Sequence, residues 1–335
     1  AGALAAAAGF AAVAAAESPG LLALGIALAG TSAGLCWAPF NDAAERVVPE
    51  TARASALSVV STGTTFGVAA AAGLALGVTA GALDWRTAWL GFALTALALA
   101  GIALAGLPPG RGAKPATDTG VAIPSLAQRS AAPLYTTALC FGMTNAVFLS
   151  FAADRVVAAG GLPGLQDEAA SAVIFLGYGV CGVLGLATGR IEARTGLAAL
   201  FCGIFTAAAL SLALIGLAPT AWSAVLAASG LHGAAVMMVS AVFSFWSQRL
   251  FPGRSTVGFT AALLAVAAGS VLGPALAGVL ATAQGPQVMF LAAAIPSLAI
   301  ALWFGAKLRR PRPRLPLVVQ VPPLRRRPGR GEPER

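Results

Sequence analysis

The stretch GLAALFCGIFTAAALSLALIGL, residues 196–217, contains no charged side chain. An α-helix rises about 1.5 Å per residue, so a segment of this length spans the roughly 30 Å hydrocarbon core of a lipid bilayer. Lipid offers the backbone no hydrogen-bonding partners, and a helix satisfies its own N–H and C=O groups. These residues therefore predict a membrane-spanning helix.

Nine further apolar stretches occur along the chain, and most of the breaks between them contain glycine or proline. Two of the ten stretches are longer than a bilayer needs, so we expect them to tilt or to extend beyond it. The ten predicted spans are 1–16, 20–38, 52–80, 86–106, 133–157, 169–189, 196–217, 221–250, 254–283 and 286–306. The sequence therefore predicts an all-α membrane protein with ten transmembrane helices.

The composition supports this class. Of 335 residues, 58% are hydrophobic and only 10% are charged, whereas a soluble protein carries about 25% charged residues. The predicted spans show no polar face of the kind that a soluble helix presents to water. The 40 glycines suit close contact between helices in lipid. These features exclude a soluble globular protein.

Several kinds of site are not expected. The four cysteines form no C-x-x-C pair and His232 is the only histidine, so we predict neither a disulfide framework nor a metal site with several histidines. No G-x-x-x-x-G-K-[ST] motif is present, and we expect no bound nucleotide or other cofactor. The net charge of +9 does not indicate nucleic acid, because ten basic residues lie in the tail 307–335, where they would attract anionic lipid headgroups.

One motif match is misleading. Residues 177–182 read GYGVCG and fit the dinucleotide-binding pattern G-x-G-x-x-G. That fingerprint requires a preceding strand and a polar helix start, but these residues lie inside an apolar span. Together with Gly185 and Gly189 they form a stripe of small residues, which predicts close helix packing.

The basic residues of the loops indicate the orientation. If the N-terminus is cytoplasmic, nine lysines and arginines of the loops lie inside, and only Arg86 and Arg155 lie outside. Cytoplasmic loops of membrane proteins carry this excess of basic residues. We therefore expect a multi-pass protein of the plasma (cell inner) membrane with both ends of this chain in the cytoplasm.

A long polar interval divides the chain into four spans and six. We expect an incomplete N-terminal bundle at 1–106, a cytoplasmic central loop at 107–132, a six-helix bundle at 133–306 and a disordered basic tail at 307–335. The division is uneven, which calls for an explanation.

A repeat offers that explanation. Residues 46–49 read RVVP and residues 249–252 read RLFP, an offset of 252 − 49 = 203 residues, and a G-x-x-x-G pair follows each, at Gly63 with Gly67 and at Gly269 with Gly273. By this offset the first half lacks about two helices. Parallel six-helix halves are a transporter architecture with a central substrate site, so we expect a six-plus-six protein whose first two helices are absent from this chain.

The chain resembles the major facilitator superfamily over that family's third to twelfth helices. Residues 189–196, GRIEARTG, resemble its cytoplasmic loop G-x-x-x-D-R-x-G, and residues 84–86, DWR, resemble an outer loop. The resemblance implies an alternating-access transporter and assigns a cytoplasmic gating role to Gly189, Glu192, Arg194 and Gly196. The family's acidic position is occupied here by Ala193, and Glu192 is the neighbouring acid.

Polar side chains within the predicted spans are candidates for the substrate site, because polar groups are costly in lipid. The resemblance places Asn145 and His232 in the seventh and tenth helices of the family, which line its central cavity. Alternatively, Asn145 forms a hydrogen bond between two helices, and His232 forms hydrogen bonds that serve only the structure. Tyr178 is a third cavity candidate, with packing as its alternative.

Two charged residues lie near the outer end of the fifth span. Asp154 and Arg155 are candidates for proton coupling or for an outer gate, and an ordinary interfacial pair is the alternative. Apart from them, the spans contain no conspicuous charge cluster, which favours a neutral or weakly charged solute.

The expected function is secondary active or facilitative transport of a small solute, with a proton as the candidate coupling ion. We expect a monomer that is not an enzyme, because one histidine and few buried carboxylates cannot build a catalytic cluster. Two alternatives remain open. One is a ten-helix drug/metabolite-type transporter, which would divide five from five, and the other is a non-transporting receptor or scaffold of the same fold.

Overall fold

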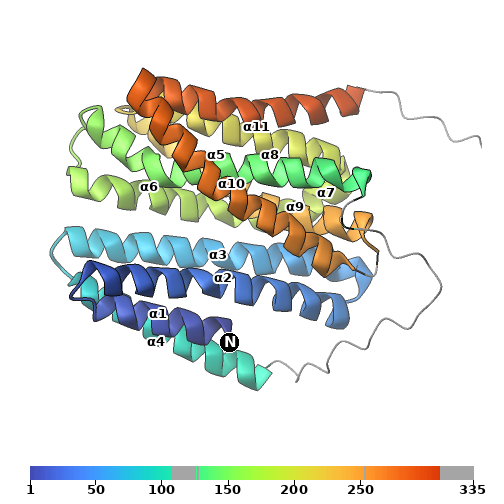
Figure 1. The fold of residues 1–335 in the computed structure, drawn as a ribbon, viewed down its shortest axis with the longest axis horizontal. Helices are drawn as coiled ribbons and strands as arrows, with labels where there is room; N and C mark the ends of the chain where they lie inside the picture. The colour runs from blue at the N-terminus through green and yellow to red at the C-terminus, as the bar shows by residue number, and fades with distance from the viewer. Residues whose placement is uncertain (107–125, 127, 253, 310–335) are drawn as a thin grey trace, which may run out of the picture.

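The computed structural model describes residues 1–106, 126, 128–252 and 254–309. The described residues form helices connected by short turns, without a strand (Figure 1). The helices are α1 (Gly2–Ala14), α2 (Pro19–Val47), α3 (Glu50–Thr79), α4 (Trp85–Gly106), α5 (Ala132–Ala158), α6 (Asp167–Gly182), α7 (Thr188–Thr195), α8 (Leu197–Leu217), α9 (Trp222–Leu250), α10 (Ser255–Gln284) and α11 (Pro286–Arg309), with 3-10 segments η1 (Arg129–Ala131) and η2 (Val183–Ala187).

The predicted all-α class with four plus six spans is confirmed. Among the described residues, nine segments are long and apolar enough to cross a membrane, and α1 is a shorter apolar helix of 13 residues. The predicted span 169–189 is one part of a longer segment, Asp167–Thr195, in which η2 connects α6 to α7. Most of the predicted central loop and the tail beyond residue 309 lie outside the described residues.

The helices form two groups. Figure 1 shows α1–α4 along one side of the molecule and α5–α11 along the other. In the first group α1 packs against α2 and α4, while in the second α5 packs against α10, α8 against α11 and α9, and α6 against α9. Contact between the groups runs mainly through α3, which packs on α6, η2 and α9.

The core of the second group consists largely of phenylalanine rings. Phe201 and Phe205 of α8 and Phe243 of α9 are fully or almost fully buried. Their rings lie about Phe141 of α5, with centroids 5.9 to 6.4 Å apart in the pairs that include Phe141. Aromatic side chains bury large areas and favour such edge-on arrangements, so this cluster packs α5, α8 and α9 together.

The glycine stripe of the sixth span lies at the contact between the groups. A side-chain carbon on Gly179 would lie 2.6 Å from the backbone nitrogen of Ala69, and one on Gly182 would lie 2.7 Å from Oγ1 of Thr65. Only glycine permits this approach of α6 to α3. The glycine stripe therefore lies at a close contact between α6 and α3, as its spacing predicts.

The two G-x-x-x-G pairs of the repeat have different environments. Gly269 and Gly273 bring α10 onto the backbone of α5 at Leu139 and Met143. Gly63 and Gly67 of α3 are exposed, and a side-chain carbon added to them would meet no atom within 4 Å. The two pairs have the same spacing in the sequence. Within the described residues, however, only Gly269 and Gly273 contact another helix.

Candidate functional site

His232 lies at the centre of a polar cluster formed by three helices. Its imidazole in α9 is fully buried. Nδ1 lies 2.7 Å from Oγ of Ser211 in α8, and Nε2 lies 3.3 Å from Oδ1 of Asn145 in α5. A buried polar group is stable only when its hydrogen bonds are satisfied, and here both ring nitrogens have partners.

With the Asn145 amide in this orientation, one tautomer of the imidazole satisfies both contacts. Oδ1 of Asn145 can only accept, so Nε2 carries the hydrogen of that bond. In a neutral imidazole Nδ1 is then an acceptor, and the Ser211 hydroxyl donates to it. The same hydroxyl hydrogen has a second acceptor in the Ala208 carbonyl, 2.8 Å away. The chain Ser211–His232–Asn145 is thus a directed set of hydrogen bonds.

The side chain of Asn145 is more accessible than the buried ring of His232. The Asn145 side chain is partly exposed, and Leu149, one turn further along α5, is 40% exposed. Within the described part of the chain, no hydrogen bond uses its Nδ2 amino group, since the one bond of the side chain is through Oδ1. Asn145 therefore presents two free N–H donors while His232 holds its carbonyl end.

Aromatic rings enclose the cluster. Phe148 stacks on the His232 ring at a centroid distance of 4.0 Å and an interplanar angle of 8°. Tyr178 of α6 is buried, with its ring 6.2 Å from His232 and 6.5 Å from Phe148. The structure thus brings the three cavity candidates predicted from the sequence into one cluster, with Tyr178 and His232 buried behind Asn145.

Asp154 and Arg155 have separate environments. Asp154 is exposed, whereas Nη2 of Arg155 donates to the backbone carbonyl of Gly216 at 3.2 Å, at the C-terminal end of α8. Helix C-termini carry unpaired carbonyl groups and a partial negative charge, which a cation stabilises. No ion pair joins these two side chains in the described residues. Arg155 thus links the C-terminal ends of α5 and α8, and Asp154 is an exposed carboxylate without an ion pair among the described residues.

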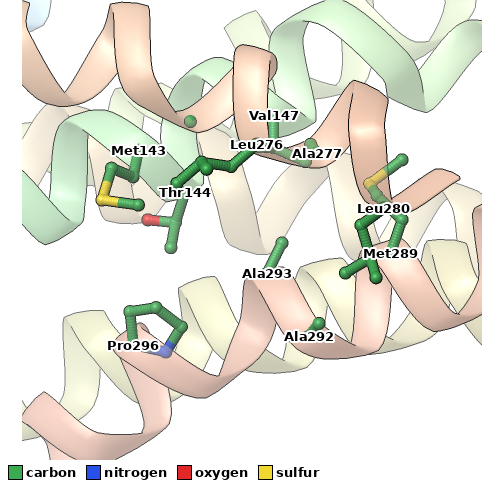
Figure 2. A pocket seen from close by; sticks show the side chains of 11 residues that line it. Met143, Thr144, Val147, Leu276, Ala277, Leu280, Met289, Ala292, Ala293 and Pro296 are labelled. Carbon is green, nitrogen blue, oxygen red and sulfur yellow. The ribbon is translucent and has the colours of Figure 1, made fainter. Parts of the chain in front are cut away.

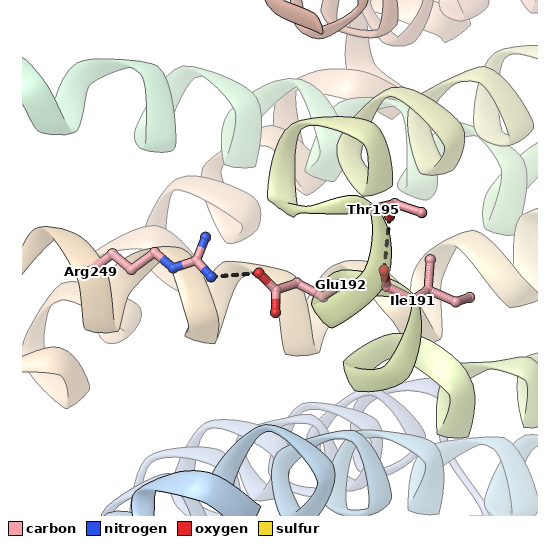
Figure 3. A network of polar contacts seen from close by, with 4 residues as sticks. All are labelled: Ile191, Glu192, Thr195 and Arg249. Carbon is pink, nitrogen blue, oxygen red and sulfur yellow. Dashed lines mark hydrogen bonds and ion pairs between the residues drawn. The ribbon is translucent and has the colours of Figure 1, made fainter. Parts of the chain in front are cut away.

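The loop that resembles the family's cytoplasmic motif contains an ion pair. Oε1 of Glu192 in α7 lies 2.5 Å from Nη2 of Arg249 in α9 (Figure 3). Glu192 is largely buried, with 14% of its side chain exposed, and Arg249 is 55% exposed. Partial burial of the carboxylate makes this pair stronger than a pair between two fully solvated side chains.

Of the remaining residues of this motif, Gly189 and Arg194 lie in α7, and Gly196 forms the turn that follows it. Gly189 is buried near the start of α7, and Arg194 is exposed. Gly196 connects α7 to α8 with φ +82 and ψ 163, a conformation that is essentially restricted to glycine. Gly196 therefore shapes the turn, and the Glu192–Arg249 pair joins the preceding helix α7 to α9.

Sequence reasoning missed Ser211, Phe148 and Arg249 as members of these sites. Ser211 is one of two hydroxyl residues in an apolar span, beside Thr206, and a polar residue at mid-span is itself a signal of bonding to another helix. Arg249 stands out in the sequence only as one of the basic residues from which the orientation was predicted. No sequence signal indicates that Phe148 stacks on a histidine 84 residues away, since 232 − 148 = 84.

Comparison with known proteins supports the fold. The chain is similar to the crystal structure of FucP, a major facilitator superfamily transporter in the outward conformation, with a TM-score of 0.64, 15% identity, and coverage of 93% of this chain and 82% of that one. It is also similar to the human organic anion transporter MFSD10 (TETRAN), with a TM-score of 0.61, 17% identity, and coverage of 90% and 75%. No curated protein matches the chain.

At these levels of identity, the two solved structures demonstrate the fold alone. The family follows from the sequence profile of the Major Facilitator Superfamily, which matches residues 1–263, more than half of the chain. Its members are transporters rather than enzymes. This chain therefore belongs to the major facilitator superfamily, a family of multi-pass membrane transport proteins.

Proposed function

We propose that the protein moves a small, neutral or weakly charged solute by alternating access, and that Asn145 donates a hydrogen bond to it. The observation that carries this proposal is the pair of unused N–H donors on a partly exposed asparagine whose carbonyl His232 holds. A solute with a carbonyl or hydroxyl oxygen would accept a hydrogen bond from these accessible donors.

His232 acts in this proposal as a positioning residue. Both of its nitrogens are engaged inside the protein and its ring is fully buried, so it orients the amide and does not touch the solute. The free carboxylate of Asp154 is the candidate for proton coupling. If uptake does not depend on a proton gradient, the protein is a facilitative transporter and Asp154 does not couple transport to protons.

The solute class follows from the neighbours of the amide. The contacts of Asn145, His232 and Ser211 described above include no cationic side chain. An anionic solute needs such a partner, so the organic anions named for MFSD10 are the second candidate class. The one observation that favours organic anions is the similarity of this fold to that of MFSD10.

The two groups of helices correspond to the proposed rocking units. We place the bundles at 1–106 and 133–306, with α3 and the glycine stripe of α6 forming the surface on which one moves against the other. The basic loops support an orientation with both ends of this chain in the cytoplasm, and the proposed protein is a monomer in the plasma membrane. Glu192 and Arg249 then lie on the cytoplasmic side, where their ion pair holds the loop between α7 and α8.

The test is solute uptake by the intact protein in proteoliposomes, with a panel of neutral polyols, sugars and amides beside organic anions. Asn145→Asp keeps the size and the acceptor for His232 but removes both donors, so transport of the preferred neutral solute should fall at least tenfold. Ser150→Ala is the matched control, because Ser150 is an exposed residue of the same helix. Uptake of anions alone, or an unchanged rate in Asn145→Asp, would overturn the proposal.

A further inference from the structure

A cavity of about 190 Å³ lies between α5, α10 and α11. It is separate from the His232 cluster and has no part in the proposed solute path. Figure 2 shows side chains of α10 and α11 facing each other across it, with those of α5 beside them. The residues that define its walls are Met143 and Val147 of α5, Leu276 and Leu280 of α10, and Ala293 and Pro296 of α11.

The wall of the cavity is apolar. Its one side-chain hydroxyl, that of Thr144, lies 3.1 Å from the carbonyl oxygens of both Cys140 and Phe141, to which it donates, and it accepts a hydrogen bond from Ser297 at 3.3 Å. A polar ligand would lose its hydrogen bonds to water here and gain none. The chemistry therefore selects a hydrocarbon ligand.

The cavity leads from an exposed rim to a buried floor. Leu276 at the rim on α10 is 59% exposed, and Ile295 of α11, next to Pro296, is 62% exposed. Thr144 and Val147 on α5 are almost completely buried. Both α10 and α11 belong to the predicted membrane spans, so the medium at the rim is the hydrocarbon of the bilayer.

Small residues and prolines leave this volume unfilled. Ala277, Ala292 and Ala293 lie on the wall, while Gly269 and Gly273 hold α10 against α5 just before it. Pro274 and Pro296 interrupt the hydrogen-bond ladders of α10 and α11 beside it. An engineered apolar cavity of about 150 Å³ in another protein stays dry and binds benzene, and this one is larger.

We propose that one acyl chain of a bilayer phospholipid inserts between α10 and α11 and occupies this cavity. The side chains that line an empty cavity lack dispersion contacts on that side, so a ligand that fills it is stabilised. Whichever way the protein is oriented in the membrane, phospholipid acyl chains are the apolar molecules at the rim. The two methionines at the site, Met143 and Met289, have flexible side chains that adapt to an irregular ligand. The inserted chain packs α11 against the rest of its bundle.

The test uses the intact protein in nanodiscs of phosphatidylcholine that carries a photoreactive diazirine at successive positions of one acyl chain. After irradiation, the labelled peptides are mapped by mass spectrometry. We expect adducts on α5 between Met143 and Val147 for at least one diazirine position, because lipid that merely surrounds the protein cannot reach this buried floor. Ala293→Trp should lower the α5 adducts at least fivefold and leave those on Leu302 unchanged.

Controls separate the cavity from general effects. Ala299→Trp places the same bulk on an exposed part of α11 and should preserve the α5 adducts. Leu276→Trp fills the cavity from the opposite wall and should also lower the α5 adducts. It replaces Ala293→Trp in the test if that variant does not fold. Absence of α5 adducts while α10 and α11 are labelled would overturn the proposal, since another protein segment would then cover the site. It would equally be overturned by α5 labelling that both filling variants leave unchanged, or by labelling with a photoreactive free fatty acid but not with the phospholipid.

Discussion

Nε2 of His232 donates to Oδ1 of Asn145 across 3.3 Å, so a fully buried ring in α9 fixes the orientation of a partly exposed amide in α5. The two residues are 87 positions apart in the chain. Ser211 holds the other side of the ring at 2.7 Å. The orientation of the proposed solute donor thus depends on a residue that the solute does not touch.

Replacement of His232 should therefore lower stability as well as transport. His232→Ala removes the stacking partner of Phe148 and leaves Ser211 and Asn145 without their shared partner. We expect a loss of about 2–4 kcal/mol in the free energy of unfolding, measured by thermal unfolding in detergent. His232→Gln, whose amide can donate to Asn145, should lose less stability and retain more uptake. Equal melting temperatures for the wild type and His232→Ala would contradict the cluster.

The contact between α3 and α6 should be sensitive to added bulk. Gly182→Leu would place a side chain where 2.7 Å separates the added carbon from Oγ1 of Thr65. We expect a loss of stability of about 1–3 kcal/mol from overpacking and a fall in uptake of at least tenfold, because the two groups can no longer approach. Gly203→Leu is the control, since that glycine is exposed with no atom near the added carbon. Similar uptake in the two variants would argue against α3–α6 as the moving contact.

The turn at Gly196 should require glycine. Gly196→Ala imposes a side chain at φ +82 and ψ 163, which costs about 1–3 kcal/mol. The melting temperature should fall, and trypsin should cleave more readily at Arg194. Gly203→Ala, on an exposed position of the adjacent helix, should change neither. Unaltered cleavage in Gly196→Ala would show that the turn accepts another conformation.

The ion pair between Glu192 and Arg249 should behave as a local link. Both residues belong to the second group of helices, so breaking the pair should loosen the loop without separating the groups. A double-mutant cycle with Glu192→Gln and Arg249→Gln should give a coupling energy of about 1 kcal/mol, at the upper end for partly exposed pairs. The exchange Glu192→Arg with Arg249→Glu should restore most of the lost stability. Additive single effects would contradict the direct pairing.

Several features of the fold could be predicted from the residues alone. The absence of charge in stretches such as 196–217 leaves a helix as the one structure that satisfies the backbone in lipid, so the membrane class and the four-plus-six division followed directly. The stripe from Gly177 to Gly189 likewise predicted a close helix contact, because small side chains have few other uses inside a span. Both are local properties of the chain.

The partners of the polar residues were decided by tertiary structure. His232, Asn145 and Tyr178 were predicted separately, yet nothing in their spacing indicates that Ser211 would hold the ring or that Phe148 would stack on it. The pairs Gly63 with Gly67 and Gly269 with Gly273 have equal spacing, and only the second meets another helix. Helical periodicity determines which residues share a face, whereas the neighbouring helix that this face meets depends on how all the spans pack together.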